Sequence, residues 1–190
     1  MRAATRHLAA PPQRAIWLWT DGSVEGGVKD GGSRAVVIWS DGEVEDLKTP
    51  AERHCSSYRA EMLALAYGLE PLEHLLDNPR DRDTSIVICT DSMASLATFR
   101  AGPTAQTSPL GVRIWRAFTR LSPEGRQPIH AQRVLSHCRI EGKELADTLA
   151  KEAAELAQED IPVDTRTICR AVARAAREAT INNCMYVCMY

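Results

Sequence analysis

The stretch WLWTDGSV, residues 17–24, alternates bulky residues and then places Asp21 before a Gly-Ser pair. This is the pattern of a β-strand that runs into a turn. A second apolar, β-branched run, SIVICTDS at residues 85–92, again ends in Thr-Asp-Ser. Two Thr-Asp pairs, each closing a buried strand, predict that strand pairing brings Asp21 and Asp91 side by side. Because a buried carboxylate is costly unless it is paired or metal-bound, the two acids indicate a hard divalent cation with oxygen ligands.

The order of the expected elements predicts a mixed sheet with helices on its faces. The first three strands are joined by short turns and form an antiparallel meander, whereas the fourth follows a helix and runs parallel to an earlier strand. Pro71 should kink or interrupt the first helix. The expected elements are strands 16–23, 34–40 and 43–48, helix 57–76, strand 84–90, helices 92–99 and 110–121, strand 129–135, and helices 142–158 and 164–180.

The length of 190 residues suits one domain of about 150 residues with two tails. We expect a disordered linker at 1–14, the folded domain at 15–158 and a helical tail at 159–190. No run of 18 apolar residues is present, so no membrane span is expected. The six cysteines are scattered and form no C-x-x-C pair, which favours a reducing, intracellular setting in the nucleus or cytoplasm.

Arginines concentrate in residues 100–139, where the only acid is Glu124. They are either an ordinary solvated helix face or a surface that meets phosphates, and the sequence leaves both open. The segment contains Arg100, Arg113, Arg116, Arg120, Arg126, Arg133 and Arg139.

Two more acids and a histidine complete a pattern. Glu61 lies near the start of the first expected helix, and Asp147 lies in the helix 142–158. His137 stands ten residues before Asp147, where the fifth strand is expected to end. Each acid alone is more often a surface charge, but the four acids occur in order and each in a suitable local setting.

This joint pattern resembles the type 1 ribonuclease H family over about residues 15–157. The phrases S-H-C-x-I-x-G-x-E-x-A-D-x-L-A (136–150) and G-P-x-x-Q-T (102–107) look most like the ribonuclease H domains of non-LTR retrotransposon polyproteins. There the domain follows a reverse transcriptase, which is therefore an expected partner. The resemblance implies an α/β, three-layer fold whose five-stranded mixed sheet has the order 3-2-1-4-5, flanked by helices.

The resemblance also implies hydrolysis of the RNA strand of RNA–DNA hybrids with two Mg²⁺ ions, for which Mn²⁺ substitutes. Asp21 would bridge both ions, Asp147 would complete the ion that activates water, and Glu61 with Asp91 would complete the other. His137 would carry a proton or assist product release, because imidazole titrates near working pH.

Residues just before Glu61 would touch the hybrid by resemblance: Ser56, Ser57 and Arg59. Ser23 and Lys143 complete the expected substrate contacts. Helix capping and a surface arginine explain the first three equally well.

Several positions depart from the family. Many members carry Asn at Ser57 and Tyr58, Trp at Arg133, Gly at Arg139 and Asn at Lys143. The extra basic helix with which some members grip the hybrid is also missing, so low affinity is expected. One alternative is therefore an inactive, structural or nucleic-acid-binding domain of a decayed element. Another is a different nuclease or transposase of the same fold, which would not need His137.

Overall fold

The computed structural model of the protein describes residues 14–26, 29–73, 84–123, 128–135, 150–158 and 165–187. Residues 150–154 are helical in addition to the labelled elements. The labelled elements are β1 (Ala15–Glu25), β2 (Lys29–Ile38), β3 (Val44–Pro50), α1 (Ser57–Glu73), β4 (Ser85–Thr90), α2 (Met93–Arg100), η3 (Pro103–Ala105), α3 (Pro109–Leu121), β5 (Ile129–Arg133) and α5 (Thr165–Val187).

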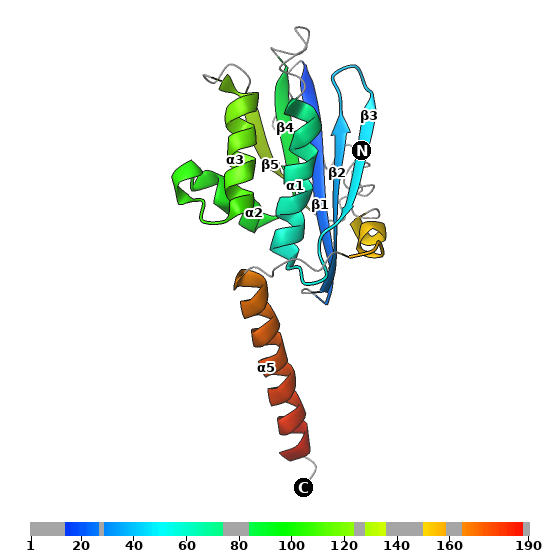
Figure 1. The fold of residues 1–190 in the computed structure, drawn as a ribbon, viewed down its shortest axis with the longest axis vertical. Helices are drawn as coiled ribbons and strands as arrows, with labels where there is room; N and C mark the ends of the chain where they lie inside the picture. Colours follow the sequence, from blue (N-terminus) through cyan, green and yellow to red (C-terminus); the bar gives the residue numbers. More distant parts are fainter. Residues whose placement is uncertain are drawn as a thin grey trace.

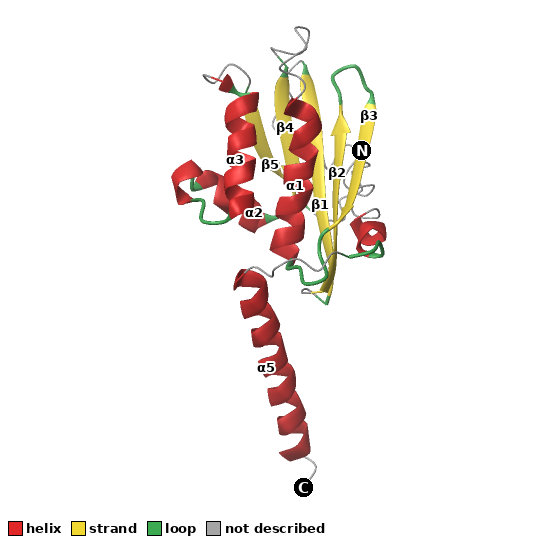
Figure 2. Cartoon of the chain, in the orientation of Figure 1, coloured by secondary structure: helices red, strands yellow, loops and turns green. Residues whose placement is uncertain are grey.

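The five strands form one mixed sheet in the order β3-β2-β1-β4-β5 (Figure 1). β1 pairs antiparallel with β2, and β2 pairs antiparallel with β3. β4 runs parallel to β1, and β5 runs parallel to β4. The predicted fold class and strand order are therefore confirmed. Figure 2 shows α1 and α3 side by side along one face of this sheet.

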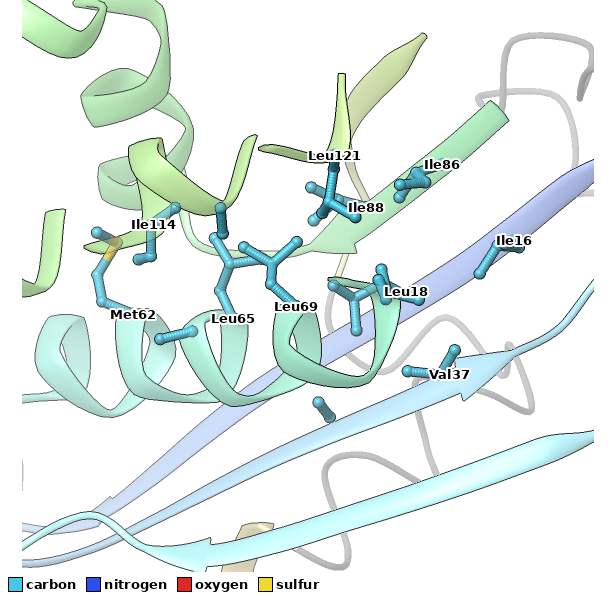
Figure 3. Close-up of a cluster of buried hydrophobic side chains, with 14 residues drawn as sticks. Ile16, Leu18, Val37, Met62, Leu65, Leu69, Ile86, Ile88, Ile114 and Leu121 are labelled. Carbon is cyan, nitrogen blue, oxygen red and sulfur yellow. The ribbon is translucent and has the colours of Figure 1, made fainter. Parts of the chain in front are cut away.

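The main core lies between that face and the helices α1 and α3 (Figure 3). Leu18 of β1, Leu69 of α1 and Ile114 of α3 are among its fully buried members. Gly68 lets α1 approach closely, since a Cβ at this position would lie 2.5 Å from Leu18 Cδ1. Pro71 does not interrupt α1 where it stands, because the helix continues to Glu73.

The opposite face of β2 carries the helical residues 150–154. Ser33 Oγ donates to Ala60 O on the α1 side, so by strand alternation its neighbours Gly32 and Arg34 face the other way. A Cβ at Gly32 would lie 2.0 Å from Ala150 O. Only glycine therefore lets this helix rest directly on the strand, where Ala150 is fully buried.

A buried arginine supports the same face. The Arg34 side chain is 1% exposed, and its Nη2 lies 2.6 Å from Asp46 Oδ2 on β3. Its Nε and Nη1 have no hydrogen-bond partner among the described residues. Burial lowers the pKa of Arg34, while Asp46 and Glu152 oppose that shift. Glu152 also accepts from Lys48 Nζ at 2.7 Å, so an ion pair joins β3 to the helix 150–154.

The last helix extends beyond its predicted range of 164–180. α5 runs from Thr165 to Val187 and projects away from the sheet (Figure 1). Thr167 is buried, whereas residues 171–178 are all exposed. No helix in the described part of the chain is long and apolar enough to cross a membrane.

The two partners of the buried ion pair should respond unequally to mutation. Asp46→Ala leaves the Arg34 charge buried and unpaired, so we expect a loss of about 2–4 kcal/mol in the free energy of unfolding. Arg34→Met removes that charge with its unpartnered N–H groups and should change stability by less than about 1 kcal/mol. Urea unfolding measures both.

Lys48→Gln is the control for this pair, because it breaks only the exposed contact with Glu152. Its cost should stay below about 1 kcal/mol. If Arg34→Met proves as destabilising as Asp46→Ala, the guanidinium contributes net stability and the burial argument is wrong.

Candidate metal centre

Three of the predicted carboxylates meet at one point. Asp21, Glu61 and Asp91 each offer a carboxylate oxygen, and these oxygens lie within 4.8 Å of one another. Asp21 and Glu61 are buried, and Asp91 is half-buried. Like charges at this separation repel by roughly 3–4 kcal/mol per pair at an effective dielectric of 20. Carboxylates gathered in this way fit a hard divalent cation with oxygen ligands.

The parallel pairing of β1 and β4 brings the two aspartates together. Trp19 pairs with Cys89, so Asp21 and Asp91 each stand two residues further along their own strand. The prediction that Asp21 closes its strand is wrong, because β1 continues to Glu25. β1 is prolonged because β2 begins at Lys29, before the predicted strand 34–40, and the two strands stay paired up to Glu25 and Lys29.

Gly22 brings Glu61 to this point. A Cβ at Gly22 would lie 2.5 Å from Glu61 N and 2.7 Å from Ala60 C. The first turns of α1 therefore press against β1 directly after Asp21, and only glycine permits this approach. Ser33 Oγ fixes the same turn by donating to Ala60 O at 2.9 Å. The sequence indicated a turn at Gly22, but in the structure this glycine lets α1 pack closely against β1.

Thr90 links two of the acids, a role that the sequence reasoning did not assign. Its Oγ1 lies 3.4 Å from Glu61 Oε2 and donates to it, and the same oxygen accepts from Ser92 N at 3.1 Å. Ser92 in turn caps α2 through Ser95 N. The turn that carries Asp91 is thus held by the hydroxyl beside it. The sequence signal for this role of Thr90 was the threonine that precedes the aspartate in both Thr-Asp pairs.

The predicted substrate contacts at the start of α1 already have partners within the protein. Ser56 is buried and accepts from Arg59 N at 3.3 Å, so it is the N-cap. The Arg59 guanidinium binds Glu52 through two contacts of 2.5 and 2.6 Å. Ser57 is exposed, and Ser23 is half-buried in β1. Their contacts with substrate stay predictions.

The other predicted site residues, His137, Lys143 and Asp147, lie outside the described residues. Described neighbours approach the cluster from both sides. On one side, Val134 N donates to Thr90 O at 2.9 Å. On the other, the helix that begins to be described at Ala150 rests on Gly32 of β2.

The arginines of α3 have acidic partners that the sequence did not reveal. Arg113 Nη2 contacts Glu70 Oε1, and Arg120 Nη2 contacts Glu73 Oε1, both on α1. These pairs neutralise part of the charge that made the segment a candidate phosphate surface. The structure favours a solvated helix face for Arg113 and Arg120.

Comparisons with known proteins agree with this geometry. The sequence matches the RNase H family over residues 13–155. Among solved structures, one similar chain is LC11-RNase H1, isolated from compost by a metagenomic approach. It shares 19% identity with a TM-score of 0.56, and the match covers 75% of this chain and 97% of that chain. This likeness shows the shared fold. No curated protein matches.

Asp21→Asn tests the cluster without an activity assay. The variant removes one of three repelling charges, so its melting temperature without metal should stay level or rise. Added Mg²⁺ should raise the melting temperature of the wild type, because a ligand that binds the folded state stabilises it, and this rise should vanish in the variant. Asp41→Asn makes the same charge change in an exposed turn and should keep the full response. An equal Mg²⁺ response in Asp21→Asn would exclude Asp21 as a ligand.

Proposed function

Because the chain belongs to the RNase H family, we propose that it is a metal-dependent endonuclease that hydrolyses the RNA strand of RNA–DNA hybrids. The single observation that carries the metal dependence is the convergence of Asp21, Glu61 and Asp91 within 4.8 Å. The scissile bond is a phosphodiester of the RNA, and the products carry 3′-hydroxyl and 5′-phosphate ends.

Asp21, Glu61 and Asp91 would hold two Mg²⁺ ions, with Mn²⁺ as a substitute. When bound, the two cations supply positive charge to the attacking and leaving oxygens of an in-line displacement. The protein contributes the arrangement of the ligands. Gly22 and Thr90 hold Glu61 in place, and the pairing of β1 with β4 sets the spacing of the aspartates.

Asp147 is the proposed fourth carboxylate. Its described neighbour Ala150 lies directly over Gly32, because a Cβ there would touch Ala150 O. Gly32 pairs with Ser23, two residues beyond Asp21. By strand alternation Asp21 faces the same side of the sheet as Gly32. An acid three residues before Ala150 therefore suits the cluster from the face opposite α1.

His137 is the proposed proton carrier. Val134, three residues earlier, donates its N–H to Thr90 O, so the chain passes beside the residue that precedes Asp91. From there the imidazole would take a proton from water or deliver one to the leaving oxygen.

The proposed substrate contacts surround the start of α1 and the end of β1. Ser57 is exposed there, and the Arg59 guanidinium is held by Glu52. Ser23 and Lys143 would complete the surface. The RNA strand would be distinguished from DNA through its 2′-hydroxyls.

We place the activity in the replication of a retrotransposon, with a reverse transcriptase domain of the same polyprotein as partner. The motif phrases at 102–107 and 136–150 support this setting. The site of action would be intracellular, in the nucleus or cytoplasm, where the hybrids arise.

Cleavage of a labelled hybrid tests the proposal. The wild type with Mg²⁺ should cut the RNA strand, EDTA should stop the reaction, and Asp21→Asn should abolish it. Single-stranded RNA and a DNA duplex of the same sequence serve as substrate controls. A wild type that binds the hybrid but leaves it intact would instead support a structural, nucleic-acid-binding domain. Undiminished cleavage by Asp21→Asn would refute the two-metal assignment.

His137→Ala should lower turnover by about 10²–10⁴-fold without abolishing it, because general acid–base help has this magnitude and the carboxylates stay intact. The exposed His130 on β5 offers a matched control, since His130→Ala should leave turnover and its pH profile as in the wild type. If His137→Ala is as inactive as Asp21→Asn, the histidine does more than carry a proton.

A further inference from the structure

The projecting helix α5 carries its charge on one side. Its 23 residues contain four arginines and one glutamate, and no lysine or aspartate. At about 100° per residue, positions 166, 170, 174 and 177 fall within an arc of about 80° and span about 16 Å of the helix axis. The helix thus carries a row of cationic positions about one turn apart, in a chain whose net charge is −2.

The opposite side of α5 is apolar but small. Ile168 and Val172 are 49% and 63% exposed, and the next positions on this side, Ala175 and Ala179, are alanines. A helix that lies in a membrane surface presents large apolar residues such as Trp, Phe and Leu. Along residues 168–179 this side offers two aliphatic side chains followed by alanines, and Tyr186 is the aromatic residue further along it, so charge exceeds apolar surface over most of the helix.

The helix is attached to the domain at its first turns. Thr167, in the first turn of α5, is buried. Further along the helix, Arg174 Nη1 donates to Gly26 O in the turn after β1. Arg174 also pairs with Glu178 one turn later. Arg177 is exposed to solvent.

This attachment lies at the end of the sheet that carries the carboxylates. Gly26 follows Asp21 by five residues, which is about 17 Å along an extended strand. Figure 1 shows α5 leaving the domain at the end toward which β1 and β4 run and where α1 begins. Arg174, the third member of the arginine row, therefore contacts the chain within one strand length of Asp21.

We propose that α5 is a nucleic-acid-binding arm whose arginine row contacts the phosphates of the hybrid beyond the carboxylate cluster. Arginines pair well with phosphate oxygens, and phosphate neutralisation supplies affinity without sequence preference. The arm would compensate for the missing basic helix noted in the sequence. This inference rests on the proposed function for the identity of the nucleic acid, because the arm extends the same site.

The test compares two triple variants that each remove three positive charges. Arg170→Gln/Arg174→Gln/Arg177→Gln changes α5. Arg113→Gln/Arg116→Gln/Arg120→Gln changes α3, where two of the three arginines bind acids of α1. Binding of a labelled hybrid is measured by fluorescence anisotropy from 50 to 300 mM NaCl, with Ca²⁺ in place of Mg²⁺ to prevent cleavage.

The α5 variant should flatten the slope of log K against log salt by about two to three units, since each phosphate contact contributes about 0.7–0.9. Its affinity at low salt should fall at least tenfold, whereas the α3 variant should match the wild type. The double variant Arg170→Gln/Arg177→Gln keeps the Arg174 contact with Gly26 and should lose one to two units. Circular dichroism melting confirms that each variant is folded.

An unchanged salt slope in the α5 variants would overturn the arm. The proposal would also be wrong if the α5 variant kept its affinity for the hybrid but no longer bound phosphatidylserine vesicles. That result would make α5 a membrane-surface helix. Failure of the proposed function is seen separately, as a wild type that does not cleave with Mg²⁺. Reduced salt dependence in the α5 variant would support the arm even then.

Discussion

Mutual repulsion of carboxylates is the constraint on which the rest of the structure depends. Three acids with oxygens within 4.8 Å favour separation, and the fold must hold them together before any cation arrives. The contacts that do so are the close packing of Gly22 against the first turns of α1 and two hydrogen bonds, from Ser33 Oγ to Ala60 O and from Thr90 Oγ1 to Glu61. Repulsion among the acids therefore lowers the stability of the folded state, and a bound cation would offset that cost.

Local signals in the sequence were sufficient to predict the antiparallel meander, the parallel fourth strand and the closeness of Asp21 and Asp91. The full strand order and the role of Glu61 were implied by the resemblance to the ribonuclease H family. Alternating apolar residues mark strands, and the Thr-Asp pairs mark where β1 and β4 meet. The sequence was insufficient where a distant partner decides the outcome. The length of β1 depends on β2, and the role of Arg113 depends on Glu70 of another helix. Pro71 does not interrupt the helix where it stands, because α1 continues to Glu73.

Arg34 is another residue whose environment depends on distant partners and could not be predicted from the local sequence. In the sequence, Arg34 stands directly before the apolar run of residues 35–38 and resembles an exposed residue at the start of a strand. Its side chain is nevertheless one of the most buried in the described structure. Its burial follows from Asp46 on β3 and from the helix that rests on Gly32. Gly22 and Gly32 admit helices to opposite faces of the sheet, and in the pairing of β1 with β2 they lie one and two pairs beyond Asp21. A site between two helices needs both glycines, and neither role is visible in one stretch of sequence.

The charges that anchor β3 also bear on how the protein behaves in concentrated solution. Within the described part of the chain β3 and β5 are the outer strands of the sheet, and an exposed edge invites pairing with the strand of another molecule. Asp46 and Lys48 on β3 would lose water and their ion pairs if a foreign strand docked there. β5 has only five residues, among them the exposed His130 and Arg133. The same ion pairs that organise the interior thus oppose aggregation of the folded protein at the β3 edge of the sheet.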